Sequence, residues 1–304
     1  MKTKKFLCAL LLVVMLFTTG AFAAIRGDQE VRGGVLRYLG TSEEAFQKGV
    51  DELRKVLSMS PALPMINRQT YETRQIVKAF HEDRVKVTFF DSLTAMLMAL
   101  NAGKLDEISL PESTAQYVMA QDPDIKILFA IRMPSAISFG FSNQNESLRN
   151  EFNNAINSMK SDNTLKALAD KYINNDTKPE PVEFAKFDGA ETIKVAVTGD
   201  MPPIDFVDEA GSPAGYNTAV ISEIGKRLKK NIELLSIESG ARSSALMSGR
   251  ADVIFWYRTT QGIMLPEELE VKDNPLNQVI SDASEGVILS EPYYNWDRVL
   301  FLNK

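Results

Sequence analysis

Two arginines and two aspartates are the residues of this sequence best suited to bind a small charged solute. Arg242 begins a predicted helix, and Arg258 follows an apolar run at 253–257. A guanidinium group can donate two parallel hydrogen bonds to a carboxylate, whereas Asp200 and Asp205 could accept hydrogen bonds from an ammonium group. The sequence therefore offers groups for both ends of an amino-acid-like solute. The alternative, that both arginines are ordinary surface residues, remains open.

Other polar and aromatic residues could join such a site. Tyr216 and Trp256 could stack on a ligand, although core packing is the alternative for Trp256. Thr41 and Ser42 could bind an anion with their hydroxyl groups and the helix N–H groups behind them, or they could simply cap that helix. The complete set of candidate ligand-binding residues is Thr41, Ser42, Asp91, Ser92, Glu112, Asp200, Pro202, Asp205, Tyr216, Asn217, Ser239, Arg242, Trp256 and Arg258.

The sequence gives little support for catalysis. Its only histidine, His81, lies in a charged stretch that is typical of a solvated helix end, and its only cysteine, Cys8, lies near the N-terminus. Neither a nucleophile elbow nor a phosphate-binding glycine loop is present. We therefore expect no catalytic residues, no metal and no cofactor, and we predict that the protein is not an enzyme.

Charge and the N-terminal segment indicate where the protein acts. A formal net charge of -6 and a pI near 5.1 argue against a nucleic-acid partner, which requires basic surface. Three lysines at positions 2, 4 and 5 precede an apolar segment at 6–17 and an A-x-A pattern at 21–23. This arrangement is typical of a signal peptide. We predict a signal peptide at 1–23 and export to the periplasm or the cell surface, with a retained membrane anchor as the alternative.

The stretch 193–228 must position most of the candidate residues. An alternating apolar run at 193–197 predicts a strand, which two prolines at 202 and 203 end. A turn is expected at 208–211, and Asn217 is expected to be the N-cap of an amphipathic helix. In open α/β sheets, ligands bind beyond the carboxyl ends of the strands. The alternative is a βα unit with an ordinary polar loop.

An internal repeat indicates two lobes with one plan. The segment 99–106 parallels 245–252: in both, a helix ends at a glycine, a basic residue follows, and a strand starts near an aspartate. We expect Asp106 and Asp252 to have structural roles. We predict a second-lobe-like segment at 30–174 with its closing helices, a linker at 175–190 and a first-lobe-like segment at 191–304.

The remaining elements follow from periodicity and from helix and strand breakers. Strands are expected at 35–39, 84–90, 105–110, 125–129, 136–141, 232–237, 253–257 and 298–302. Helices are expected at 41–57, 70–80, 93–101, 111–119, 148–159, 164–173 and 241–247.

Several motifs resemble a known family, the extracellular solute-binding proteins of ABC importers, in the family 3 group that carries polar amino acids. The motifs that resemble its first lobe, in order, are GDMPPIDF at 199–206, GYN at 215–217, SGAR at 239–242, GRADV at 249–253 and SEPYY at 290–294. The N-terminal half resembles the second lobe, in GVLRYLGT at 34–41 and in the element at 99–106. The order of the lobes is thus exchanged, as in a circular permutation, and two partial copies in tandem are the alternative.

The resemblance implies a two-lobed fold like that of type II periplasmic binding proteins, in which each lobe is a mostly parallel sheet flanked by helices. It also implies capture of a small polar solute, such as an amino acid or a related compound, in a cleft between the lobes, and delivery to an ABC transporter permease. The alternatives are a ligand-sensing module for a membrane receptor, or a degenerate binding protein without a transport role. An enzyme carrying a binding-protein module would require a further catalytic domain.

Overall fold

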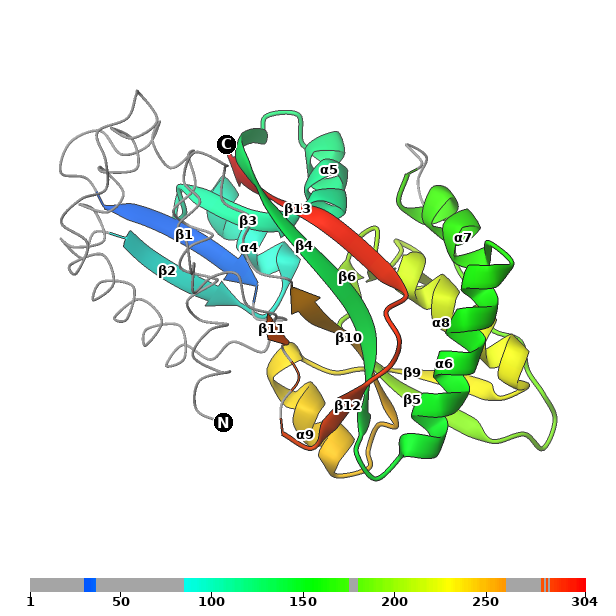
Figure 1. Ribbon diagram of the computed structural model, residues 1–304. Helices are drawn as coiled ribbons and strands as arrows, with labels where there is room; N and C mark the ends of the chain where they lie inside the picture. The colour runs from blue at the N-terminus through cyan, green and yellow to red at the C-terminus, as the bar shows by residue number, and fades with distance from the viewer. Residues whose placement is uncertain (1–29, 37–84, 175–179, 261–279, 282, 284) are drawn as a thin grey trace, which may run out of the picture. The chain divides into compact units, whose positions relative to one another are not determined.

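The computed structural model describes residues 30–36, 85–174, 180–260, 280–281, 283 and 285–304 (Figure 1). The chain divides into two compact units. The first unit comprises residues 1–135, 260–282 and 296–304, and the second comprises residues 136–259 and 283–295. Strands β4 (Lys126–Ser142) and β13 (Tyr294–Asn303) contribute residues to both units.

The first unit is built on a mostly parallel sheet. Strand β1 pairs in parallel with both β2 and β3, and β13 pairs antiparallel with β3. Helix α4 buries one apolar face, formed by Leu93, Met96 and Leu100, as the spacing predicts. The elements are β1 (Val31–Leu36), β2 (Val85–Phe90), α4 (Leu93–Asn101), β3 (Glu107–Pro111), α5 (Glu112–Gln121) and β11 (Ile280–Ser281).

The second unit contains a parallel arrangement of β10, β5 and β9, with β12 antiparallel to β4. A three-stranded antiparallel sheet of β6, β7 and β8 follows β5. The elements are α6 (Glu146–Ser161), α7 (Thr164–Tyr172), β5 (Thr192–Val197), β6 (Asp200–Met201), β7 (Asp205–Val207), β8 (Pro213–Ala214), α8 (Tyr216–Leu228), β9 (Asn231–Ser236), η2 (Ser239–Ala241), α9 (Arg242–Met247), β10 (Val253–Thr260) and β12 (Val287–Leu289).

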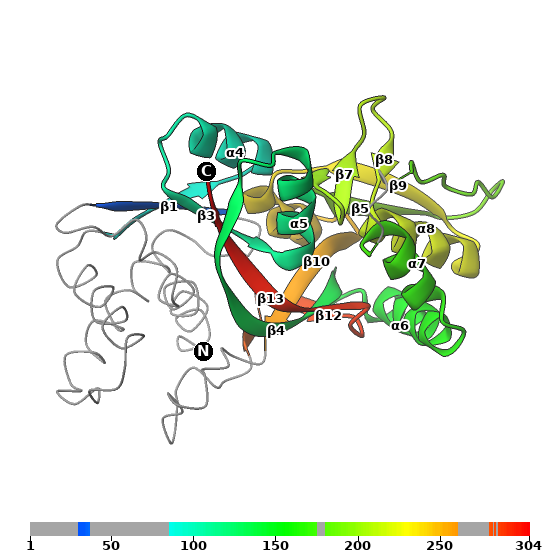
Figure 2. The same ribbon diagram turned by 90° about the horizontal axis from the view of Figure 1, so that it is seen from above.

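The predicted α/β class is confirmed. The structure has a large, mostly parallel sheet with helices, and each unit contains parallel strand pairs. In the second unit, α6 and α7 pack against α8 (Figures 1 and 2). The predicted segments 30–174 and 191–304 stay a prediction. The part of the predicted linker that the structure describes is also attached to this unit: Val182 N donates to Pro213 O at 2.8 Å, and Phe187 N donates to Asn231 Oδ1 at 2.8 Å.

The internal repeat is present as two matching hydrogen-bond patterns. In the first unit, Asp106 N donates to Arg32 O at 2.8 Å, and Arg32 N donates to Asp106 Oδ2 at 2.8 Å. In the second unit, Asp252 N donates to Lys194 O at 2.8 Å, and Lys194 N donates to Asp252 Oδ2 at 2.8 Å. Each aspartate therefore joins the start of its strand to the neighbouring parallel strand, and this explains why it recurs.

Most predicted elements occur within a few residues of their expected bounds, with three differences. Residues 125–129 and 136–141 belong to one long strand, β4, and β1 starts four residues before the expected position 35. Asn217 is not an N-cap, because α8 begins at Tyr216 and Gly215 is the capping residue. Gly215 has φ 105°, and a Cβ there would lie 2.5 Å from Ile204 O, so only glycine fits. The signal peptide and the helices predicted at 41–57 and 70–80 lie outside the described residues.

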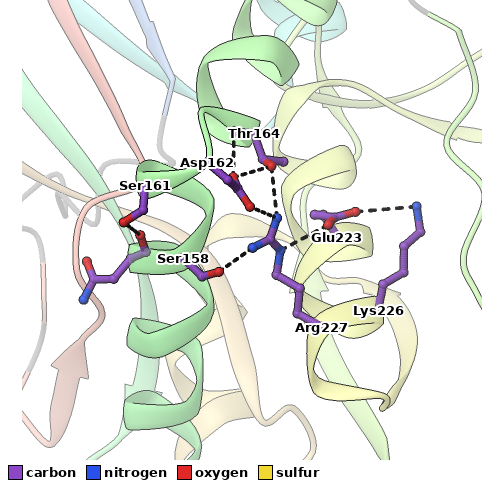
Figure 3. Close-up of polar contacts among 8 residues, drawn as sticks. Ser158, Ser161, Asp162, Thr164, Glu223, Lys226 and Arg227 are labelled. Atoms are coloured by element: carbon purple, nitrogen blue, oxygen red, sulfur yellow. Dashed lines mark hydrogen bonds and ion pairs between the residues drawn. The ribbon is translucent and has the colours of Figure 1, made fainter.

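One arginine ties α8 to the junction between α6 and α7 (Figure 3). Arg227 Nη1 donates to Ser158 Oγ at 2.6 Å, and Arg227 Nη2 donates to Asp162 Oδ2 at 2.7 Å and to Thr164 Oγ1 at 3.0 Å. Its Nε donates to Glu223 Oε1 at 3.1 Å within α8. The planar guanidinium group thus contacts three helices at once, in a way that a lysine could not.

Asp162 is the acceptor at the centre of this network. Its carboxylate accepts hydrogen bonds from Thr164 Oγ1 at 2.6 Å and from Thr164 N at 3.0 Å, at the start of α7. These bonds, the hydroxyl first, together with Arg227, lower the pKa of Asp162 to about 2. The carboxylate is therefore charged over the whole physiological pH range and remains available to Arg227.

Replacing Arg227 should destabilise the second unit. We expect Arg227→Met to lower the free energy of unfolding by about 1–2 kcal/mol, because it removes several charge-assisted hydrogen bonds, partly screened by solvent. Urea denaturation followed by circular dichroism measures this change. Lys226→Met is the matched control, since among the described residues the ion pair of Lys226 is the one within its own helix, to Glu223 at 3.7 Å. Equal stabilities of the two variants would contradict a role for Arg227 in joining the helices.

Candidate functional site

The candidate site begins at the carboxyl end of β5 in the second unit. The β6–β7 hairpin turns back on this end, where Val207 N donates to Gly199 O at 3.1 Å. As a result, Thr198 Oγ1 donates to both oxygens of the Asp205 carboxylate, at 3.0 and 3.3 Å. The side chain of Asp205 is buried, and the residue is only 1% exposed. The peptide bond between Pro202 and Pro203 in this hairpin is cis.

Burial dominates the electrostatics of Asp205. It raises the pKa of the Asp205 carboxyl group to about 7, against the opposing effects of the Arg242 charge and the Thr198 hydrogen bond. The charge of Asp200 raises this pKa further. A carboxyl group with such a pKa binds or releases a proton near neutral pH.

Arg242 is a buried residue and not a surface arginine. It is 4% exposed, and its Nη1 donates to Phe255 O of β10 at 2.8 Å. Burial lowers the pKa of Arg242, while the neighbouring Asp205, foremost among several groups, raises it. The Arg242 guanidinium group therefore lies close enough to the Asp205 carboxylate for their charges to interact. The sequence analysis assigned these two groups to opposite ends of the same solute.

Two tyrosines lie beside these charges. Tyr216 Oη donates to Tyr293 O at 2.8 Å, and the ring of Tyr293 stacks on Phe139 with centroids 4.2 Å apart. Burial raises the pKa of Tyr293 well above its usual value, with contributions from Tyr216 and Asp205. The Tyr293 hydroxyl oxygen has no hydrogen-bond partner among the described residues. The sequence analysis named Tyr293 only within the SEPYY motif, because the motif does not indicate which of its two tyrosines is buried.

Asn217 is a further buried polar group at the start of α8. It is fully buried, and neither its Oδ1 nor its Nδ2 has a hydrogen-bond partner within the described part of the chain. Its backbone N donates to Ile204 O at 2.8 Å, which fixes it next to the hairpin. Buried amides are normally satisfied. The Oδ1 and Nδ2 atoms of Asn217 can therefore form further hydrogen bonds.

The remaining candidates in the second unit are placed by their elements. Arg258 in β10 is 2% exposed and thus, like Arg242, is not a surface residue. Asp200 and Pro202 are half-buried in and after β6. Ser239 lies in η2 and Trp256 in β10, and the positions of their side chains lie outside the described structure.

The first-unit candidates have partners of their own. Ser92 is the N-cap of α4, and its Oγ accepts a hydrogen bond from Ala95 N at 3.1 Å. Asp91 directly precedes it. Glu112 accepts a hydrogen bond from Arg298 Nε at 3.0 Å and forms an ion pair with the same guanidinium. Thr41 and Ser42 lie outside the described residues.

A cavity of about 380 Å³ opens beside Thr198 and Asp205 in the second unit. Within the described ranges, no group of three histidine, cysteine, aspartate or glutamate residues could hold a metal ion. In the same ranges, no helix has the length and apolar character needed to span a membrane.

The segment that carries this site has a recognisable family signature. Residues 193–261 match the model of bacterial extracellular solute-binding proteins, family 3. The resemblance inferred from the motifs is thereby confirmed for this segment, which includes Asp205, Arg242 and Arg258. The exchanged order of the lobes stays a prediction.

Several solved structures are similar to the chain. The ligand-binding component of an ABC-type import system from Staphylococcus aureus, solved with zinc bound, is 11% identical over 90% of this chain and 66% of its own, with a TM-score of 0.36. The periplasmic aliphatic sulphonate-binding protein SsuA from Escherichia coli is 11% identical over 90% of this chain and 65% of its own, with a TM-score of 0.35.

A third structure, the PBP AgaA from A. tumefaciens R10 in complex with agropinic acid, is 10% identical over 72% of this chain and 55% of its own, with a TM-score of 0.38. The chain thus spans less than two thirds of the length of each of these proteins. A comparison with curated protein sequences gives no match.

The raised pKa of Asp205 predicts a pH-dependent stability. Below about pH 4 the carboxyl group is protonated in both the folded and the unfolded state. Between about pH 4 and 7 only the unfolded state releases the proton, so stability falls as pH rises, and above pH 7 the loss is constant. Asp205→Asn should therefore gain stability relative to the parent between pH 4 and 8, by up to about 4 kcal/mol.

Chemical denaturation of both proteins at several pH values measures this gain. The control is Asp188→Asn, which removes an exposed carboxylate of the same unit. A stability difference between Asp205→Asn and the parent that stays constant across this pH range would show that the carboxyl group titrates normally.

Proposed function

We propose that the protein is an extracytoplasmic solute-binding component of an ABC importer, which captures a small polar solute and presents it to a membrane permease. The observation that carries this proposal is the buried charge cluster of Asp205 and Arg242, in a segment that matches a solute-binding family. Burying opposite charges is costly, because each charged group loses its hydration. A binding site repays that cost when the ligand arrives.

The residue types favour a solute with a carboxylate, an amine or both. Arg242 and Arg258 are the groups proposed for a carboxylate, and Asp200 and Asp205 are those proposed for an amine. Asn217, with its buried amide, and Tyr216 are proposed to complete the recognition. An amino acid or a related compound carries this combination of groups.

Export follows from the same proposal. A solute-binding component acts outside the cytoplasm, and the lysine-rich N-terminus with its A-x-A pattern supplies a matching signal peptide at 1–23. The proposed partners are therefore a solute outside the cell membrane and a permease within it.

The proposal is tested by a search for the solute and then by substitution. Mass spectrometry of small molecules released from the purified protein, together with thermal shifts against amino acids, amines, peptides and sulfonates, should identify a stabilising compound. A ligand at 100 times its Kd stabilises a protein by about 2.7 kcal/mol. The absence of both a released compound and any stabilising compound would contradict the function.

Once a solute is found, Arg242→Lys and Arg258→Lys should separate the roles of the two arginines. Lysine keeps the charge but loses the paired hydrogen bonds of the guanidinium group, so the variant at the carboxylate contact should bind about tenfold more weakly or worse. Titration calorimetry measures the affinities. Arg250→Lys, an exposed arginine of the same unit, is the control. Unchanged affinity in both test variants would refute the carboxylate assignment.

A further inference from the structure

Strand β9 is the last strand in the order of the sheet in the second unit. Among the described strands it pairs with β5 alone, in a parallel register. Asn231 N donates to Glu191 O at 2.8 Å, and Ile237 N donates to Val197 O at 3.0 Å. The odd-numbered residues of β9 therefore direct their backbone groups toward β5, and the even-numbered residues direct theirs toward the opposite side, the free edge.

The same even-numbered residues line the cavity beside Thr198. Ile232, Leu234 and Ser236 all contribute to its wall, because alternate residues of a strand lie on one face. The cavity holds about 380 Å³, and it is open to solvent, since Val207 and Ser236 in its lining are exposed. One short stretch of β9 thus offers backbone donors and acceptors directly beside a cavity.

The cavity suits an uncharged, apolar side chain. Phe184 adds to its apolar wall, and the described lining contains no lysine, arginine or histidine. The buried polar side chains of the wall are engaged within the protein: Thr218 Oγ1 donates to Ala214 O at 3.0 Å, and both Asp205 oxygens accept from Thr198 Oγ1. A charged group that entered the cavity would lose hydration without gaining a charged partner.

The opposite face of β9 favours a positive charge on an added strand. Lys194 of β5 and Glu233 of β9 are partners in the register, and both are exposed. Asp252 lies on the other side of Lys194, where its Oδ2 accepts a hydrogen bond from Lys194 N at 2.8 Å. The charges along this row alternate in sign. A cation beside Glu233 would continue the alternation, since opposite charges on neighbouring strands attract each other.

We propose that the free edge of β9 is a docking site for an extended segment of a partner protein, in which an apolar residue enters the cavity and its sequence neighbours are basic. The segment would add a strand to the sheet through hydrogen bonds with the three even-numbered residues of β9. Its alternate side chains would point toward the cavity and toward the face that carries Glu233. This surface uses neither Arg242 nor Arg258, so the inference goes beyond the proposed solute site.

Two other occupants fit this edge less well. Strand β9 itself contains no basic residue, so a second copy paired antiparallel along β9 would place no cation beside Glu233. A short free peptide carries charged termini, for which the described lining of the cavity has no basic residue and only the buried, engaged carboxylate of Asp205. An internal segment of a longer chain has an uncharged backbone and can carry basic side chains.

The first test uses the probe peptide acetyl-Thr-Lys-Leu-Lys-Thr-amide, whose symmetric sequence suits either strand direction. With this peptide at saturation, amide hydrogen exchange of the full-length protein, followed by nuclear magnetic resonance, should slow about tenfold at Ile232, Leu234 and Ser236. The amides of Glu233 and Leu235 already point toward β5 and should change little. A contact through side chains alone would not produce this alternation.

Variants of the probe separate the backbone, the cavity and the charge. N-methyl groups on the leucine and both lysines remove the backbone donors, and we expect binding to weaken about tenfold or more. Glutamate in place of the leucine, or in place of both lysines, should weaken binding by a similar factor. The same sequence with free termini should bind no more tightly than the capped peptide.

Variants of the protein locate the site. Leu234→Pro removes an outward N–H and leaves the hydrogen bonds to β5, because proline is tolerated where the N–H faces away from the sheet. It should bind the probe about tenfold more weakly than Leu234→Ala, which keeps that N–H. Val207→Trp should obstruct the cavity, whereas Met247→Trp, which changes an equally exposed residue outside the lining, should bind like the parent. If Leu234→Pro does not fold, the tryptophan pair and the methylated probe decide the question.

Several outcomes would overturn the inference: no binding of the capped probe, equal binding of the methylated probe, or exchange that slows without alternation along β9. Tighter binding of the peptide with free termini would identify a short peptide as the occupant and would also overturn it. So would a dimer of the protein that Leu234→Pro dissociates, since the occupant would then be a second copy. The thermal-shift panel tests the solute-binding function separately from all of these outcomes.

Discussion

The hydrogen bond from Thr198 Oγ1 to the Asp205 carboxylate is the interaction on which the candidate site depends. This bond joins Thr198, directly after β5, to Asp205 at the start of β7. If the β6–β7 hairpin moved away from the end of β5, the Asp205 carboxylate would lose this hydrogen bond. Gly215 then brings the start of α8 against the same hairpin through its close approach to Ile204. Asn217 and Tyr216 acquire their positions from this approach.

Much of the second unit could be predicted from its residues, because local patterns determined it. The alternating apolar run of β5, the glycine at 249 and the aspartate at 252 each have a local physical requirement that the structure meets. The N-cap at Asn217 was predicted wrongly, since side-chain propensity favours asparagine there. The close contact with Ile204, which demands glycine one position before the helix, involves a chain segment eleven residues away.

Long-range packing accounts for what the sequence could not provide. The inward orientation of Tyr293 depends on Phe139, which is more than 150 residues earlier in the chain. The burial of Arg242 and Arg258 was left open because an arginine near an apolar run is compatible with both core and surface. The packing of α6 and α7 in the second unit likewise includes long-range contacts such as that of Asp162 with Arg227, and no local pattern around 146–172 indicates this partner.

The contact of Arg227 with Ser158, Asp162 and Thr164 has a consequence for the order in which the chain folds. Helices α6 and α7 leave the ribosome well before α8, and their partner in this network is more than sixty residues away. Pairings of such sequence separation form slowly, because the loop between them must first be closed. The packing of α6 and α7 against α8 therefore forms only after about residue 230 has emerged.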